Sequence, residues 1–199
     1  MSAIQSFYEK QYSSVMQRLR HDLNVKYLYH DGRHTEDVLR QAQEIAYREG
    51  VNTHEIALLK LAALYHDVGF LRQRENHEEV GVDIFLAEAA ESDIPQSDKD
   101  LICRLIMVTK VPQQPKTLLE SIICDADLDY LGRDDFPAIS EFLYLEFKSC
   151  GVVNDRKRWN EIQLSFLEAH RFHTVSSQKL RANTLERNIA FVRRRHAEM

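Results

Sequence analysis

The segment LLKLAALYHDVGF, residues 58–70, constrains the fold more than any other stretch of the sequence. Apolar residues fall on nearly every face of the expected helix, which is typical of a central helix surrounded by other elements. We expect this helix to run from about Thr53, its candidate N-cap, to about Asp67. Its end is unusual because His66 and Asp67 are ionisable and yet follow an apolar run. A buried carboxylate in the last turn, where the helix dipole is negative, needs a cation or several donors nearby. A divalent metal ion would meet that need.

The remainder of the chain also favours helices. Its 199 residues include only 6 glycines and 4 prolines, and 44% are hydrophobic, enough for a substantial core. We therefore expect an all-α fold: a compact helical bundle that forms a single domain over residues 1–199. The other expected helices cover about residues 3–20, 33–50, 77–91, 97–109 and 117–132, with three more after residue 134. Asp31 is the candidate N-cap of the second helix.

Charge and patterning argue against several classes of protein. The N-terminus has no basic region followed by an apolar run, and no segment approaches the roughly 18 apolar residues of a membrane span. We expect a soluble, cytoplasmic protein with no membrane partner. The formal net charge of -5 disfavours nonspecific nucleic-acid binding, and the basic run at residues 193–196 is favourable at a helix C-terminus. Three cysteines without a CxxC spacing argue against a thiolate zinc site.

Two further clusters carry residues suited to metal chemistry. In YHDGRH, His30 and His34 are four positions apart around an expected helix start, so both can face one cleft. In CDADLD, Asp125, Asp127 and Asp129 crowd the end of an apolar helix, and they repel each other unless something positive is shared. Helical periodicity does not choose among these aspartates. Imidazole and carboxylate ligands without thiolate suit Mn, Fe, Co, Ni or Zn, while Mg is less comfortable on imidazole.

The order of these residues resembles the pattern of the HD superfamily of metal-dependent phosphohydrolases. That pattern has one histidine, a histidine-aspartate doublet and a distal aspartate, and it covers roughly residues 27–136 of this chain. The C-terminal helices, about residues 137–199, form an extension to this family core. The resemblance implies one metal ion shared by four residues, and it selects Asp127 over Asp125 as the distal ligand. The implied ligands are His34, His66, Asp67 and Asp127.

The opening of the pattern also resembles the YHNxxH segment of cyclic nucleotide phosphodiesterases, in which the first histidine protonates the leaving oxygen. This likeness makes His30 a candidate general acid beside His34 as a ligand. Asp31 departs from the asparagine of that segment, and the other signatures of those enzymes are not evident. A cyclic nucleotide substrate is therefore not implied.

Three other residues are candidates for contact with a phosphorylated substrate. His77 resembles the extra histidines by which some HD proteins hold a second metal ion or contact phosphate. We favour a site with one metal ion, because the segment MVTKVP lacks a histidine where members with two metal ions often supply one. His77 then becomes a residue that contacts the substrate or supports a ligand. Arg33 and Lys110 are cationic candidates for phosphate.

The resemblance implies a metal-dependent phosphohydrolase for a small phosphorylated molecule, such as a nucleotide, with His30 and Asp67 as catalytic residues. The metal ion would be Mn, Co, Ni, Fe, Zn or Mg. Two alternatives stay open: a catalytically silent HD domain that acts as a nucleotide or metal sensor or interaction module, and an oxygenase with two iron ions. The second alternative needs additional histidine ligands, of which His77 is the plausible one. A homodimer is compatible with the sequence.

Overall fold

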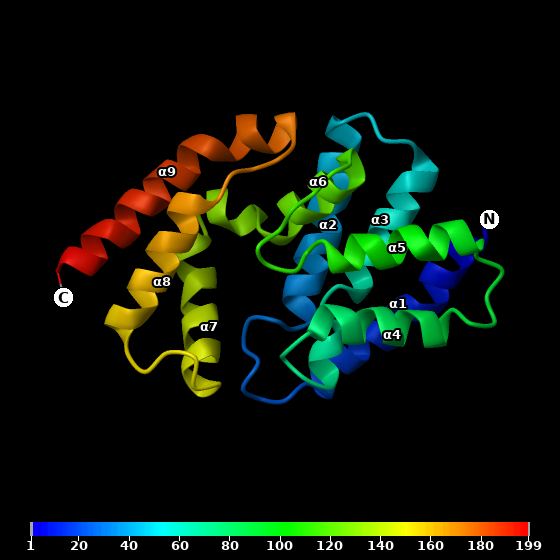
Figure 1. Cartoon of the computed structure of the whole chain (residues 1–199), viewed down its shortest axis with the longest axis horizontal. Helices are drawn as coiled ribbons and strands as arrows, with labels where there is room; N and C mark the ends of the chain where they lie inside the picture. The colour runs from blue at the N-terminus through cyan, green and yellow to red at the C-terminus, as the bar shows by residue number, and fades with distance from the viewer. Residues whose placement is uncertain (1, 199) are drawn as a thin grey trace.

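The computed structural model describes residues 2–198, and this part of the chain contains helices and no strands (Figure 1). The expected all-α fold is therefore confirmed. In chain order the elements are α1 (Ala3–His21), α2 (Gly32–Arg48), α3 (Thr53–Tyr65), η1 (Val68–Leu71), α4 (His77–Glu88), α5 (Gln96–Met107), α6 (Leu118–Asp127), η2 (Asp129–Gly132), α7 (Phe136–Ser149), α8 (Arg156–Ala169) and α9 (Val175–Ala197). The elements η1 and η2 are single turns of 3-10 helix.

The helices form two groups with separate hydrophobic clusters. The largest cluster joins α1 to α6. Smaller clusters join η2 with α7, α8 and α9, and α7 with Trp159 of α8. Figure 1 shows the two groups side by side, with α7, α8 and α9 on the left and the earlier helices on the right. Side chains from both groups line a cavity of about 460 Å³.

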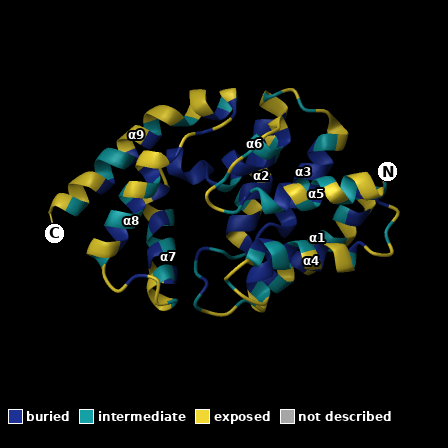
Figure 2. Ribbon diagram, viewed as in Figure 1, coloured by how far each residue is buried: buried dark blue, intermediate teal, exposed yellow. Residues whose placement is uncertain are grey.

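Helix α3 lies at the centre of the first group, as its apolar sequence predicts. Nine of its residues are buried, from Ile56 to Tyr65, and Figure 2 shows this helix almost entirely in the colour of buried residues. The prediction of its length was wrong by two residues. The α-helix ends at Tyr65, with His66 as C-cap, and Asp67 lies at the junction with η1, where its φ of -108° and ψ of 3° leave the helical range. Because the backbone conformation changes at this junction, the side chains of His66 and Asp67 can approach the same point.

Capping explains where two of the helices begin. Asp31 is the N-cap of α2, as predicted, and its carboxylate accepts hydrogen bonds from the backbone N–H groups of Arg33 and His34. The predicted cap of α3 was wrong, because Asn52 and not Thr53 has the extended backbone that an N-cap requires. The Asn52 side chain accepts from the backbone N–H of Glu55.

The chain packs tightly where the ends of α3 and α4 meet. Gly69 of η1 lies so close to the start of α4 that a Cβ atom there would sit 1.9 Å from the carbonyl oxygen of His77. Gly81 of α4 similarly faces the carbonyl oxygen of Tyr65, at 2.8 Å from an added Cβ atom. These two glycines let α4 pass close to the end of α3, and they bring His77 near Asp67.

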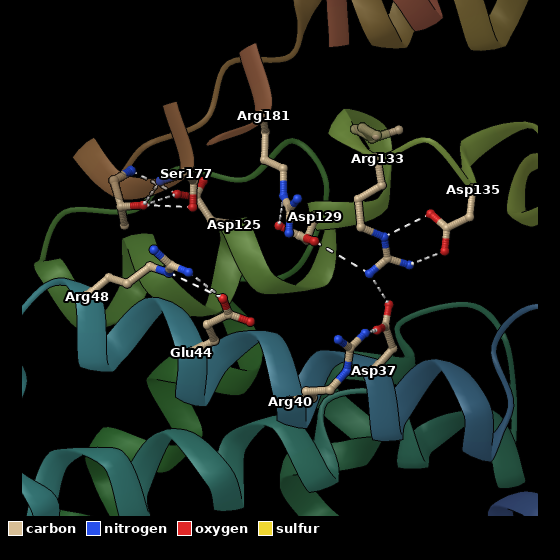
Figure 3. A network of polar contacts seen from close by, with 12 residues as sticks. Asp37, Arg40, Glu44, Arg48, Asp125, Asp129, Arg133, Asp135, Ser177 and Arg181 are labelled. Carbon is tan, nitrogen blue, oxygen red and sulfur yellow. Dashed lines mark hydrogen bonds and ion pairs between the residues drawn. The ribbon is translucent and has the colours of Figure 1, made fainter. Parts of the chain in front are cut away.

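A network of ion pairs and hydrogen bonds docks α9 against the first group (Figure 3). Asp129 accepts from Arg181 of α9 at 2.8 Å and from Arg133 at 3.4 Å. Arg133 also binds Asp37 of α2 at 2.7 Å, so it connects α2 to the turn after α6. Gly132 completes this contact, because a Cβ atom there would lie 2.4 Å from Cβ of Arg181.

Between residues 2 and 198, none of the helices combines the length and the apolar character needed to cross a lipid bilayer.

Candidate metal centre

His34 enters the site from the first turn of α2. The Asp31 cap fixes the start of that helix, and the His34 ring lies 4.6 Å from the ring of Tyr29, measured between centroids. Its side chain is only 6% exposed. The Nε2 atom of His34 lies 3.3 Å from Oδ1 of Asp127 and 3.4 Å from Oδ2 of Asp67. The N-cap motif thus places this imidazole against two carboxylates that come from distant parts of the sequence.

His66 and Asp67 reach the same point from the end of α3. His66 donates from Nδ1 to the carbonyl oxygen of Ala63 at 2.8 Å, which leaves Nε2 as the nitrogen that faces the carboxylates. This Nε2 atom lies 3.2 Å from Oδ2 of Asp67, 3.7 Å from Oδ1 of Asp127 and 3.2 Å from Nε2 of His34. A backbone carbonyl that holds one ring nitrogen of a histidine is the usual way in which a metal-binding tautomer is fixed.

The three aspartates at the end of α6 have three different environments. Asp127 faces His34 and His66, and its second oxygen accepts from Gln113 at 3.0 Å. Asp125 is fully buried and accepts from the backbone N–H groups of His173 and Thr174, both at 2.8 Å, and from the Thr174 hydroxyl. The third aspartate, Asp129, binds the two arginines shown in Figure 3. The three carboxylates therefore do not share one cation, and only Asp127 points to the two histidines.

The side chains of His34, His66 and Asp127 form a group that could hold a metal ion. One ligand atom from each lies within 4.8 Å of the others. Oδ2 of Asp67 is buried beside this group and accepts no hydrogen bond, although the Nε2 atoms of both histidines are near it. A buried carboxylate oxygen without a donor is costly, and a cation would satisfy it. The donor set of imidazole nitrogens and carboxylate oxygens fits a divalent ion of the Mn to Zn series.

Electrostatics in this cluster favour positive charge. Burial opposes a proton on His66, but the carboxylates of Asp67 and Asp127 outweigh it and raise the pKa of His66 to about 9. Burial likewise opposes ionisation of Asp67, yet His66 and His77 hold the pKa of this carboxyl well below its usual range. The cluster therefore attracts either a proton or a metal ion to the point between its side chains.

His30 lies beside the cluster and has an acidic partner that the sequence pattern did not reveal. Its Nδ1 atom is 2.5 Å from Oε1 of Glu146, a buried glutamate of α7. The other oxygen of Glu146 accepts from the backbone N–H groups of Tyr29 and His30, at 2.9 and 3.1 Å. The His30 ring stacks on Phe70 at 4.4 Å between centroids. These contacts fix the ring and leave Nε2 as the nitrogen available to a substrate.

A cavity of about 460 Å³ opens beside this cluster. Its lining includes Asp67, Asp127 and three of the other predicted residues, which are His30, His77 and Lys110. The Nε2 atom of His77 lies 3.3 Å from Oδ1 of Asp67, and its Nδ1 atom donates to the carbonyl oxygen of Arg74. Lys110 lies at the cavity with its ammonium group on Glu79 and Asn76.

The structure places Arg33 away from the cavity beside Asp67. This side chain lines a second cavity, of about 300 Å³, together with Phe142 and Arg133, and it does not line the cavity beside Asp67. Arg33 is 66% exposed and paired with Asp31. Proximity to the cap residue of α2 accounts for its position, because the same carboxylate that begins the helix binds its guanidinium group.

Sequence reasoning missed several residues of the site. Glu146 carried a signal, since an acidic residue within the apolar and aromatic stretch of residues 142–147 implies a buried partner. Gln113 lies in a loop between two prolines, and nothing in its sequence context links it to Asp127. Arg74, which also lines the cavity, had no distinguishing signal in a chain with many arginines.

Comparisons with known proteins agree with this geometry. The model of the HD domain family matches residues 32–129 of the chain. The fold is similar to that of a protein from an uncultured Thermotogales bacterium that is described as a predicted HD superfamily hydrolase. The two are 21% identical, with a TM-score of 0.62 and coverage of 100% of this chain and 99% of that chain. A protein of known structure from Lactobacillus plantarum is 16% identical, with a TM-score of 0.63 and coverage of 96% and 97%.

No curated protein matches the sequence significantly. The matched range of the family model begins at the first residue of α2 and ends within η2, so it contains His34, His66, Asp67 and Asp127. The family resemblance that the sequence order implied is thereby confirmed. Residues 32–129 of this chain match the HD domain family.

Proposed function

We propose that this protein is a metal-dependent phosphohydrolase that cleaves a phosphate ester or anhydride bond of a small molecule, with a nucleotide or related metabolite as the expected substrate. The observation that carries the proposal is the convergence of His34, His66, Asp67 and Asp127. The two aspartates of this group line the 460 Å³ cavity. Cavities of this size are typical of sites for small organic molecules.

The four residues would hold one divalent ion, through the Nε2 atoms of the histidines and one oxygen of each aspartate. Such an ion lowers the pKa of water and polarises a phosphoryl oxygen, which is the chemistry that phosphate ester hydrolysis requires. Asp67 is positioned to bind the ion through its Oδ2 atom, which is buried and accepts no hydrogen bond. Its Oδ1 atom is held by His77, which therefore orients the carboxylate.

His30 supplies the proton for the departing oxygen. Glu146 accepts from Nδ1 of the ring, which leaves the Nε2 atom of His30 at the cavity as the nitrogen that carries the proton to the leaving group. Protonation of a leaving group by a positioned side chain contributes about 10²- to 10⁴-fold in rate. Lys110 at the cavity is positioned to contact the phosphate. His77 has both ring nitrogens engaged, with Arg74 and Asp67, and Arg33 lines the other cavity, so neither contacts the phosphate in this proposal.

A screen of phosphorylated metabolites with the metal-reconstituted protein tests this function. Mn, Co, Ni and Mg would be compared, and release of inorganic phosphate or pyrophosphate would be measured. We expect turnover of one substrate class with at least one of these ions. An absence of turnover with every ion, combined with binding of a nucleotide, would instead indicate a sensor or interaction module.

A further inference from the structure

The cavity beside the candidate metal centre has a wall that the HD domain match does not include. Helices α7 and α8, which follow residue 129, contribute mostly apolar side chains to the lining. These are Leu143, Phe147, Trp159, Ile162 and Phe166. The polar residues that could bind phosphate, by contrast, come from the first group of helices and the loops between them.

Much of this wall is not covered by the protein itself. Leu143, Phe147, Ile162 and Phe166 are half-buried, although each belongs to an apolar cluster. Trp159 is buried behind them, with its ring 5.4 Å from that of Phe147 in an edge-to-face contact. Apolar surface that lines a cavity gains free energy when an apolar ligand group displaces water from it.

Arg74 extends this wall on the side of the first group. Its guanidinium carbon lies 5.2 Å from the centroid of the Phe147 ring. Among residues 2–198 Arg74 forms no ion pair, so its charge is not neutralised by a carboxylate of the described chain. A planar cation over an aromatic ring forms a flat surface that also attracts the ring of a ligand.

The size of the cavity fits a substrate with two parts. A phosphate group bound beside Asp67 would fill only a small share of 460 Å³. The part of the wall that α7 and α8 contribute to the remaining space is aromatic and aliphatic. Gln163 is the polar exception among the lining residues of α7 and α8, and its amide nitrogen donates a hydrogen bond to the Ser140 hydroxyl.

We propose that α7 and α8 determine substrate specificity by binding a large, ring-bearing apolar group of the phosphorylated substrate against Phe147 and Phe166. This proposal rests on the proposed function for the phosphate end of the substrate. It assigns the C-terminal helices a role in recognition, and it makes small polar phosphate esters such as glycerol phosphate poor substrates.

Binding of two non-hydrolysable probes separates this proposal from the proposed function. The probes are 3-phenylpropylphosphonate and propylphosphonate, which share the phosphonate and differ by one phenyl ring. Calorimetry on the manganese-loaded protein gives each Kd. Trp159, the single tryptophan of the chain, reports by fluorescence whether the ligand lies in this cavity. We expect the phenyl compound to bind at least about tenfold more tightly, which is the scale of burying one aromatic ring.

Substitutions of the cavity lining in α7 and α8 then test which side chains cause the preference for the phenyl probe. Phe147→Ala and Phe166→Ala should each reduce the preference to within about threefold, because most of the buried ring contact is lost, while the Kd of propylphosphonate stays unchanged. Phe142→Ala is the matched control, since this phenylalanine lies on α7 but lines the second cavity. Should an alanine variant fail to fold, Phe147→Leu and Phe166→Leu keep the volume and remove the ring.

Equal Kd values for the two probes in the unsubstituted protein would overturn the proposal, and so would failure of both probes to bind. A preference that survives in both wall variants would also overturn it. If the preference is present and depends on Phe147 and Phe166, but the matching phosphate esters are not hydrolysed, the recognition role stands and the phosphohydrolase proposal fails.

Discussion

The Nε2 atoms of His34 and His66 face each other at 3.2 Å, and neither side chain is more than 6% exposed. A neutral His66 presents the lone pair of Nε2 toward His34, because its Nδ1 atom donates to the carbonyl oxygen of Ala63. That lone pair can bind either a proton or a metal ion. A proton and a metal ion therefore compete for the Nε2 atom of His66.

Metal affinity should rise with pH. The pKa of His66 is raised to about 9, so below that value a proton must leave Nε2 before an ion can bind. We expect the apparent affinity for Mn²⁺ to increase by up to about tenfold for each pH unit between 6.5 and 8.5, the limit for release of one proton. Calorimetry in buffers of different ionisation enthalpy measures both the affinity and the proton released. A flat profile would contradict this account of His66.

The same shift affects folding of the chelator-treated protein. A histidine whose pKa is raised from 6.5 to about 9 in the folded state adds stability that is fully present below pH 6.5. This contribution is lost as the pH rises through 9. We therefore expect the Tm of metal-free protein to fall from pH 6.5 to 9, and added Mn²⁺ to raise Tm most at the upper end. An equal Tm increase at both ends would argue against proton displacement.

Asp125 and Asp127 should respond differently to the same substitution. Asp125→Asn turns an amide N–H toward the buried donors of His173 and Thr174, so it should lower the free energy of unfolding by about 1–3 kcal/mol. The metal affinity of the Asp125→Asn variant should stay within a few fold of that of the unsubstituted protein. Asp127→Asn should weaken metal binding by at least about tenfold and affect stability little, because its side chain is partly exposed. Denaturant unfolding and metal titration of both variants check this, and a reversed pattern would assign the ligand to Asp125.

Glu146 should matter most for substrates with poor leaving groups. Glu146→Gln replaces the carboxylate that accepts from Nδ1 of His30 by an amide of similar shape. We expect kcat for an alkyl phosphate to fall about 10²-fold or more, with a much smaller fall for 4-nitrophenyl phosphate, whose leaving group needs no proton. The double variant with His30→Asn should lose little more than either single variant, since the two residues act as a unit. Equal losses for both substrates would point to a structural role for Glu146.

Gly69→Ala should disturb the start of α4. The added Cβ atom would lie 1.9 Å from the carbonyl oxygen of His77, and backbone atoms must move to admit it. We expect a loss of about 1–3 kcal/mol in the free energy of unfolding, measured by denaturant titration. Gly32→Ala is the control, because its nearest contact is the flexible side chain of Arg20, and it should cost less.

The fold and the centre of the site were largely predictable because they depend on local sequence. An apolar run with no polar face can only be a buried helix, and α3 is one. Asp31 before a helical pattern is a local N-cap signal, and it fixes His34 as a first-turn residue. The ends of α3 were less predictable, because the shift to η1 at Val68 depends on the close approach of α4 to Gly69.

The surroundings of the site were not predictable, because they come from contacts over long sequence separations. Glu146 is 116 residues from His30, and Asp125 accepts from the backbone N–H of Thr174, the N-cap of α9, 49 residues away. Spacing alone left the aspartates at the end of α6 equivalent, and the three-dimensional contacts separate them. The sequence made Arg33 a candidate for phosphate binding, but its side chain pairs with Asp31 and lines a different cavity.

The most direct test of the central claim is phosphatase activity of the metal-loaded protein beside His66→Ala and Asp67→Ala, with the metal content of each sample measured. We predict about one ion per chain in the unsubstituted protein, at least about tenfold weaker metal binding in both variants, and loss of hydrolysis with that ion. Full hydrolytic activity in both variants would contradict the proposal that His34, His66, Asp67 and Asp127 form the metal centre of a phosphohydrolase.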